Sequence, residues 1–218
     1  MPTTPGMLPT YQDLIDWNLK TRAFPMVDNY EEGVEYHRLQ VEYFIWANTF
    51  HGVYPRPIID IGGEWKRPYI LDVLNLNHQE YDTDYCQVRP DILASITALP
   101  FASGSIGTII CTETLEHVPN LFRAITELRR VLRPRGLLLA STPFMWPDHT
   151  SPPLFNDYWR LTEPAWRFLL NDFTDVHVAP TRLRPSSFPH LRNLSNSESY
   201  GDDILDRFHT GYLVGAIK

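Results

Sequence analysis

Apolar residues near the start of the chain follow helical spacing. Prolines at positions 2, 5, 9 and 25 leave room for one short helix, from Tyr11 to Leu19. From Tyr30 to about Phe50 the apolar positions recur at intervals of 3 and 4 residues, which predicts a helix with one stripe facing the domain. The stripe consists of Tyr36, Leu39, Tyr43, Trp46 and Phe50. Residues 1–55 are therefore expected to form a helical cap or lid, and residues 56–218 the main domain.

Beyond this cap, short apolar segments alternate with helical ones. Strands are expected at residues 57–61, 80–84, 90–95, 106–111, 137–141, 176–178 and 211–218. Helices are expected at residues 67–76, at residues 120–132 with Asn120 as N-cap, and after Thr162; residues 67–76 also fit a strand. This alternation predicts an α/β fold with a doubly wound, mostly parallel sheet. The polar residues 179–210 are interpreted as an insertion before the last strand.

The bulk composition argues against several classes of protein. The formal net charge of -7 disfavours nucleic-acid binding, which depends on clustered Lys and Arg. The cysteines, Cys86 and Cys111, belong to no CxxC or spaced Cys/His set, so neither a disulfide framework nor a metal site is expected. No apolar run reaches the roughly 20 residues of a membrane span, and the first residues lack a signal pattern. A cytoplasmic protein with a small-molecule substrate is therefore expected, with no membrane partner.

Two motifs within residues 109–136 carry a resemblance to a known family. Leu115-Glu116-His117-Val118 and the segment from Arg130 to Gly136 (RVLRPRG) resemble the LEHV and RVLKPGG segments of class I S-adenosylmethionine-dependent methyltransferases. The resemblance implies a Rossmann-like fold, S-adenosyl-L-methionine as cofactor, and a terminal antiparallel strand after an insertion. In open α/β sheets ligands bind outside the carboxyl ends of the strands, so each strand end is a candidate binding position.

The first predicted strand ends in a glycine turn. Its sequence IIDIGG resembles the glycine-rich motif of the family, where backbone lies against the methionine part of the cofactor. The resemblance assigns Asp60, Gly62, Gly63 and Glu64 to the cofactor site. The copy is degenerate, because the family spaces its glycines by one residue, and an ordinary Gly-Gly turn is the alternative interpretation.

The ribose of the cofactor calls for an acidic residue after the second strand. Asp84 follows Asp60 by 24 residues, close to the family spacing, and a carboxylate can accept hydrogen bonds from both ribose hydroxyls. Tyr85, beside it, is also assigned to the cofactor site. Asp72 is the rival if residues 67–76 form the second strand.

The next two strand ends supply the remaining cofactor residues. After the third, Ser95 stands where the family uses an Asp for the adenine amino group, and Ile96 is placed against the purine. After the fourth, Cys111 and Thr112 are expected beneath the sulfonium. His117 is assigned to the same site, and a structural role is preferred for it over a catalytic one.

The segment after the fifth strand is expected to face the acceptor. Residues 142–149 (TPFMWPDH) and 156–162 (NDYWRLT) resemble the TPF…H and DYYRFT pattern of a subgroup whose members modify sugars and other small polar metabolites. His149 is the candidate general base, Asp157 could orient it, and Arg160 could clamp an anionic group. The alternative interpretation is a loop anchored by an internal Asp157–Arg160 ion pair.

Two functions from different classes follow. The first is S-adenosylmethionine-dependent methyl transfer to an oxygen or nitrogen of a small polar metabolite. The second is a catalytically inactive methyltransferase-like binding or scaffold protein, motivated by departures from the family pattern at Glu64, Ser95, Gly107 and Arg135. A nicotinamide-dependent oxidoreductase is disfavoured, since no GxGxxG follows the first strand. The N-terminal apolar stripe could also pair two copies as a homodimer.

Overall fold

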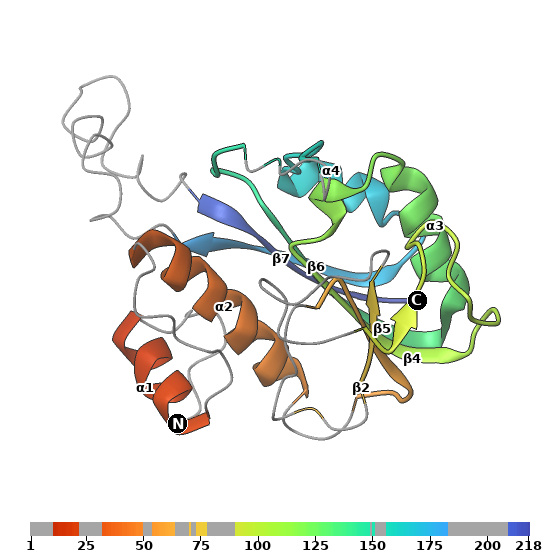
Figure 1. Cartoon of the computed structure of the whole chain (residues 1–218), viewed down its shortest axis with the longest axis horizontal. Coiled ribbons are helices and arrows are strands. Elements are labelled where there is room, and N and C mark those ends of the chain that lie inside the picture. The colour runs from red at the N-terminus through yellow and green to blue at the C-terminus, as the bar shows by residue number, and fades with distance from the viewer. Residues whose placement is uncertain are drawn as a thin grey trace.

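A computed structural model describes residues 11–21, 32–49, 54–63, 70, 73–77, 90–148, 150, 156–182 and 209–218 of the 218-residue chain. Seven strands form one sheet in the order β3-β2-β1-β4-β5-β7-β6. They are β1 (Ile58–Ile61), β2 (Val73–Asn77), β3 (Ile92–Leu93), β4 (Ile106–Thr112), β5 (Leu132–Pro143), β6 (Thr174–Arg182) and β7 (His209–Ile217). Helices lie on both faces of the sheet, which confirms the doubly wound α/β fold (Figure 1).

The strand directions place the edge of the sheet where ligands bind. Strands β3, β2, β1, β4 and β5 run parallel, and β7 runs antiparallel to both β5 and β6. The terminal antiparallel pair is therefore confirmed. From β1 the chain proceeds to β2 and β3 on one side, and then returns to β4 on the other side of β1. The carboxyl ends of β1 and β4 thus flank the topological switch point.

Two capped helices cover one face of the sheet. Helix α3 (Leu121–Val131) begins after Asn120, whose side chain accepts a hydrogen bond from Arg123 N, as predicted. Helix α4 (Glu163–Leu169) begins after Thr162, whose hydroxyl accepts from Ala165 N. The fully buried Trp166 joins α4 to the core that α3 and the sheet share.

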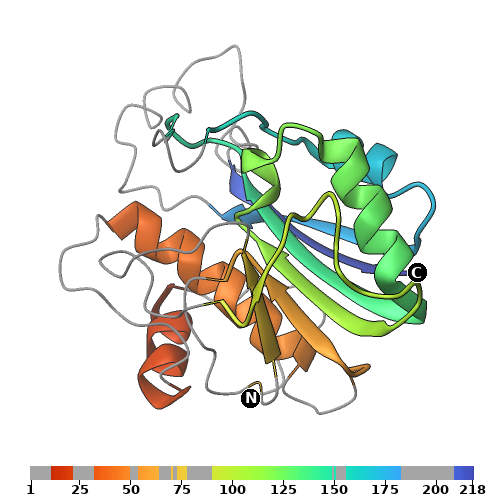
Figure 2. The same cartoon turned by 45° about the vertical axis from the view of Figure 1, so that its right-hand side comes forward.

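The helices α1 (Tyr11–Thr21) and α2 (Glu32–Thr49) lie on the other face, with α2 against the sheet and opposite α3 (Figure 2). The prediction for the apolar stripe of α2 is wrong. Leu39, Tyr43 and Trp46 pack against α1, whereas Val41 and Ile45 pack against β1, β4 and β7. The helix carries apolar residues on two sides, because it is sandwiched between α1 and the sheet. The described part of the stripe, Leu39, Tyr43 and Trp46, thus packs within the chain, and the homodimer stays a prediction.

The second strand differs from the preferred prediction. Residues 73–77 form β2 and pair parallel with β1, so the strand alternative for residues 67–76 is the correct one and the helix is wrong there. Five residues with Leu74 and Leu76 among them are too short a pattern to separate the two periods. Residues 80–84, expected as the second strand, lie outside the described residues. The division into a cap and a main domain at residue 55 stays a prediction.

Strand β5 is longer than predicted. Helix α3 ends at Val131, and Leu132 is already extended, with φ -62° and ψ 134°. The predicted helix end at residue 132 is therefore confirmed to within one residue, whereas the strand begins at Leu132 and not at Leu137. Pro134 explains part of this difference, since a residue before proline favours extended backbone.

Candidate active site

The glycine turn after β1 lies against the turn after β4. Gly62 has a φ of +77°, and its N–H donates to Leu76 O of β2 at 2.9 Å. A Cβ on Gly62 would overlap Thr114 Oγ1 and lie 3.0 Å from Thr114 Cγ2. A Cβ on Gly63 would lie 2.7 Å from Asp60 Oδ2. Gly62 therefore requires glycine, because of its positive φ and the overlap with Thr114, whereas a side chain at Gly63 would displace the Asp60 carboxylate.

The carboxyl end of β3 supplies a polar and an apolar neighbour to this turn. Ser95 is exposed, and its hydroxyl hydrogen bonds with Thr97 Oγ1 at 2.8 Å. Ile96 is buried in the same core cluster as Ile61 of β1. The structure thus brings the Ser95–Ile96 step and the glycine turn to the same edge of the sheet. Glu64, Asp84, Tyr85 and His149 lie outside the described residues, and their roles stay predictions.

The last residue of β2 is one that the sequence prediction missed. Asn77 occupies the strand end to which Asp84 was assigned, and its carbonyl accepts a hydrogen bond from Ala94 N at 2.8 Å. Neither Asp72 nor Asp84 is a residue of this strand. A strand assigned to residues 73–77 would have predicted Asn77 at its carboxyl end.

The end of β4 contributes backbone more than side chains. Cys111 is fully buried within the core, and burial, with added repulsion from Glu116 and Asp60, raises the pKa of its thiol far above the ordinary value. A thiol in this state is inert. Thr112 O accepts a hydrogen bond from Thr114 Oγ1 at 2.9 Å. The buried Cys111 side chain could therefore not contact a cofactor, and only the main chain of both residues and the Thr112 side chain could do so.

Glu113 follows β4 directly, and the sequence prediction missed it. Its φ of 49° is unusual for a residue other than glycine. Ser141 of β5 donates a hydrogen bond to Glu113 Oε1 at 2.6 Å, and His37 Nε2 of α2 lies 3.1 Å from Oε2. The carboxylate is therefore held by contacts from strand β5 and from helix α2.

His37 is itself fixed on its other side. Its Nδ1 lies 3.0 Å from Thr210 Oγ1 and 3.3 Å from Thr181 Oγ1, and the two hydroxyls are 2.8 Å apart. The ring of Trp146 stacks on the imidazole at a centroid distance of 6.2 Å. These contacts join α2 to β6, β7 and the segment after β5. No spacing between histidines could have revealed them, because the partners are 144 and 173 residues away in sequence.

Two neighbouring glutamates in this turn have opposite protonation behaviour. Burial alone would raise the pKa of Glu113, but His37, Arg38 and the Ser141 hydroxyl lower that pKa to about 2. Burial raises the pKa of Glu116 well above its usual range, and the Glu113 carboxylate adds to the effect. Glu116 is fully buried, and neither carboxyl oxygen has a hydrogen-bond partner among the described residues. The environment of the turn therefore favours the charged form of Glu113 and disfavours the charged form of Glu116.

His117 and Arg160 both tie down the segment that precedes α4. His117 Nδ1 donates to Asn156 O at 2.9 Å, in keeping with the structural role preferred for it. Arg160 forms a two-pronged ion pair with Asp157, and Arg160 Nη2 also donates to Trp146 O at 3.4 Å and Pro147 O at 3.2 Å. This geometry favours the anchored-loop interpretation of Asp157 and Arg160. Their contact with a substrate stays a prediction.

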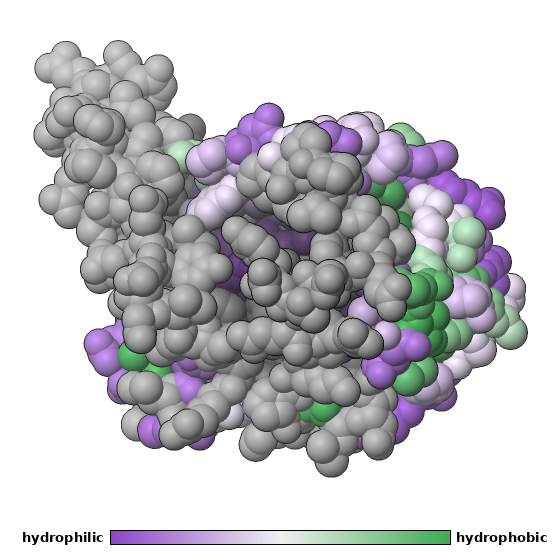
Figure 3. Space-filling view, viewed as in Figure 1, coloured by the Kyte–Doolittle hydropathy of each residue, from purple (hydrophilic) through white to green (hydrophobic). Residues whose placement is uncertain are grey.

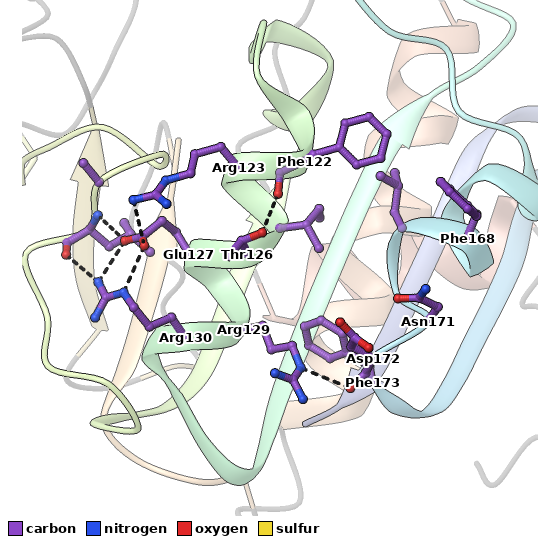
Figure 4. Close-up of a pocket in the computed structure, with 14 residues that line it drawn as sticks. Phe122, Arg123, Thr126, Glu127, Arg129, Arg130, Phe168, Asn171, Asp172 and Phe173 are labelled. Atoms are coloured by element: carbon purple, nitrogen blue, oxygen red, sulfur yellow. Dashed lines mark hydrogen bonds and ion pairs between the residues drawn. The ribbon is translucent and has the colours of Figure 1, made fainter.

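A groove of about 910 Å³ lies between α3 and α4, away from the strand ends. Figure 4 shows Arg130 and Arg123 directed at Glu127, which leaves these three groups paired with one another. The rings of Phe122 and Phe168, both exposed, meet edge to face at 6.4 Å. Apolar residues also gather on the side of the surface where α3 lies (Figure 3). Because no strand of the described part of the chain ends at this groove, and because Glu127 at its rim is paired with Arg123 and Arg130, this groove is not the candidate active site.

Comparison with known proteins agrees with the fold. A family profile described as "Methyltransferase domain" matches residues 68–140. A structure described as a SAM-dependent methyltransferase from Archaeoglobus fulgidus superposes with a TM-score of 0.57 at 16% identity, covering 96% of this chain and 100% of that chain. The [4+2]-cyclase SpnF superposes with a TM-score of 0.52 at 16% identity, covering 94% and 93%. At these identities the likeness concerns the fold.

Sequence relatives match over short segments. An uncharacterized methyltransferase of Mycobacterium sp. (strain KMS) is 44% identical over 50 residues, 23% of this chain and 20% of the relative. The thiol S-methyltransferase TMT1A of Homo sapiens is 30% identical over 94 residues, 42% of this chain and 36% of the relative. The chain thus spans a fifth to about a third of the length of these relatives. The matched segment and the fold both resemble those of S-adenosylmethionine-dependent methyltransferases.

The residues at the switch point fit S-adenosyl-L-methionine as a methyl donor. The fit rests on the glycine turn after β1, which puts two residues without side chains at the carboxyl end of the strand, packed against Thr114 and Asp60. None of the described helices is long and apolar enough to cross a membrane.

Proposed function

We propose that the protein transfers a methyl group from S-adenosyl-L-methionine to an oxygen or nitrogen of a small polar metabolite. The observation that carries the proposal is the glycine turn at the switch point, packed against the β4 turn by the Gly62–Thr114 contact. In open α/β sheets this is where nucleotide-like ligands bind. The methyltransferase profile that matches residues 68–140 supports S-adenosyl-L-methionine as the ligand.

Each strand end would bind a different part of the cofactor. Gly62 and Gly63 would hold the methionine part by backbone, with Asp60 beneath them. Asp84 would accept hydrogen bonds from the ribose. Ser95 would accept from the adenine amino group, and Ile96 would contact the ring. When bound, the cofactor supplies an electrophilic methyl group.

The acceptor would enter from the side of β5 and the segment after it. His149 would take a proton from the nucleophile, because an imidazole titrates near neutral pH. The Asp157–Arg160 pair would keep Trp146 and Pro147 in place and so position His149, which follows them in sequence. Holding the nucleophile in line with the methyl group is the larger contribution to such a displacement.

The alternative, a catalytically inactive binding or scaffold protein, was motivated by four departures from the family pattern, and two of them have structural explanations. A Cβ at Gly107 would overlap Pro55 O, so the start of β4 requires glycine. Arg135 adopts a φ of 61° in an exposed, irregular stretch at the start of β5, the end of that strand away from the switch point. Neither position touches the switch point, so neither counts against cofactor binding.

Calorimetric titration with S-adenosyl-L-methionine and S-adenosylhomocysteine tests the proposal. Replacing Asp84 by Ala is expected to weaken both ligands by at least about tenfold, or about 1.4 kcal/mol. Asp72→Ala, the rival position, is expected to bind as wild type. The opposite ranking would assign the ribose to Asp72.

A serine pair provides a second contrast on described residues. Ser95 and Ser105 are both exposed serines in turns, at the carboxyl end of β3 and just before β4, respectively. Ser95→Ala should weaken both ligands, and Ser105→Ala should not. Failure of the wild-type protein to bind either ligand would refute the proposed function.

A further inference from the structure

One buried anion in the crevice has no part in the cofactor contacts described so far. Glu113 lies one residue from Thr114, which touches the glycine turn of β1, so its backbone lies beside the β1–β4 switch point, and its carboxylate lies between Ser141 of β5 and His37 of α2. Its side chain is 13% exposed, and that of its partner His37 is 4% exposed. A carboxylate in this setting is shielded from bulk water and acts on its surroundings more strongly than a surface charge.

The Glu113 carboxylate is held in place, but not all of its hydrogen-bond acceptor positions are used. A carboxylate offers about four acceptor positions, and Glu113 uses one for Ser141 and one for His37. The left-handed backbone of Glu113, at φ 49°, is strained for a residue that carries a Cβ. Strain of this kind persists where surrounding contacts hold a residue in place, and it concentrates at ligand sites.

We infer that Glu113 selects the charge of the methyl donor, and that His37 of α2 is the positioning residue that holds its carboxylate toward the crevice. The inference rests on the proposed function. The donor carries a positive sulfonium, whereas the product S-adenosylhomocysteine carries a neutral thioether at the same place. A fixed anion near that atom stabilises the donor over the product, so transfer of the methyl group itself weakens the hold on the product.

His37 gives the N-terminal helix a part in this selection. The imidazole is clamped between Glu113 and the hydroxyls of Thr181 and Thr210, and a Cβ at Gly211 would lie only 2.8 Å from His37 Cε1. The ring therefore has little freedom to move away from the carboxylate. Helix α2 is then part of the donor site and not only its cover.

The test is the ratio of the dissociation constants of S-adenosylhomocysteine and S-adenosyl-L-methionine, measured by calorimetry without any methyl acceptor. Glu113→Gln keeps the shape of the side chain, and a change of His37 tautomer can accommodate the amide. The ratio is expected to fall about fivefold or more in this variant, because one buried charge is removed. Weaker binding of the donor, with the product little changed, is the expected source of the fall.

Glu116→Gln is the matched control, because it makes the same chemical change three residues away. Burial disfavours the charged form of Glu116, and its carboxyl group contacts neither Ser141 nor His37, so the ratio should stay within about twofold of wild type. His37→Asn should lower the ratio in the same direction as Glu113→Gln. A defect of packing alone would weaken both ligands equally and leave the ratio unchanged.

Each outcome decides the inference. Wild-type binding of both ligands with an unchanged ratio in Glu113→Gln would overturn it and leave the proposed function standing. Equal weakening of both ligands in Glu113→Gln would also overturn it, since that result assigns the residue a purely structural role. Loss of binding in the wild-type protein would instead remove the proposed function on which it rests.

Discussion

Replacing Gly62 by Ala tests whether the switch-point turn is built on bare backbone. Two costs add at this position. The φ of +77° disfavours a residue with a Cβ by about 1–2 kcal/mol. The new methyl group would also overlap Thr114 Oγ1 and lie 3.0 Å from Thr114 Cγ2, and overpacking of this kind costs about 1–3 kcal/mol. Gly62→Ala is therefore expected to lower the free energy of unfolding by about 2–5 kcal/mol.

A double-mutant cycle with Thr114→Ala separates the two costs. Thr114→Ala removes Oγ1 and Cγ2 and leaves only Thr114 Cβ, 3.2 Å from the new methyl group. By itself it loses the hydroxyl's hydrogen bonds to Ile61 O and Thr112 O, at about 1 kcal/mol. In the double variant the overlap is gone, so the two substitutions should couple favourably by about 1–3 kcal/mol.

Urea unfolding followed by tryptophan fluorescence measures all four corners of this cycle. The chain has six tryptophans, and Trp166 is fully buried in the core. Additive effects, with a coupling below about 0.5 kcal/mol, would refute the steric argument and leave only the backbone conformation as the reason for glycine.

Three further predictions concern stability. Arg135→Gly should raise the free energy of unfolding by about 0.5–1 kcal/mol, because glycine adopts the φ of 61° without strain; urea unfolding would show a higher midpoint, and a lower one would contradict the reasoning. Thr162→Ala should cost about 1 kcal/mol in the same assay by removing the N-cap of α4, and no loss would mean that the cap contributes nothing. The two glutamates should respond oppositely to pH. With a folded pKa of about 2 against an ordinary 4.5, Glu113 contributes stability above pH 4.5 that disappears as the pH falls toward 2, so Glu113→Gln should be destabilised near neutral pH and approach wild type in acid. The raised pKa of Glu116 has the reverse sign, so Glu116→Gln should gain on wild type as the pH rises above 4.5; parallel pH profiles for the two variants would contradict both assignments.

Helices could be predicted where a capping side chain marks their first turn. Asn120 marked the start of α3, and Thr162 that of α4, because side-chain caps are local and leave a direct signature. Strand β2 could not be assigned firmly, since five residues of mixed polarity fit a helix turn as well as a strand. The orientation of α2 failed for a different reason. A helix between two layers has two apolar sides, and spacing alone does not say which side meets the sheet.

The residues of the candidate site also differ in whether the sequence could predict them. Gly62 and Gly63 could be found because a turn at a strand end is encoded by adjacent residues. Glu113 and His37 could not, because their pairing depends on bringing α2 over the end of β4, 76 residues away in sequence. Arg160 could be noticed as a charged residue, but only the folded chain shows that its donors are taken by Asp157 and by main-chain carbonyls.

A crystal structure of the protein grown with S-adenosylhomocysteine tests the central claim most directly. The account predicts the homocysteine part along the backbone of Gly62 and Gly63, with the adenine beside Ser95 and Ile96. Density for the ligand in the groove between α3 and α4, or a switch point that stays empty at saturating ligand, would contradict the account.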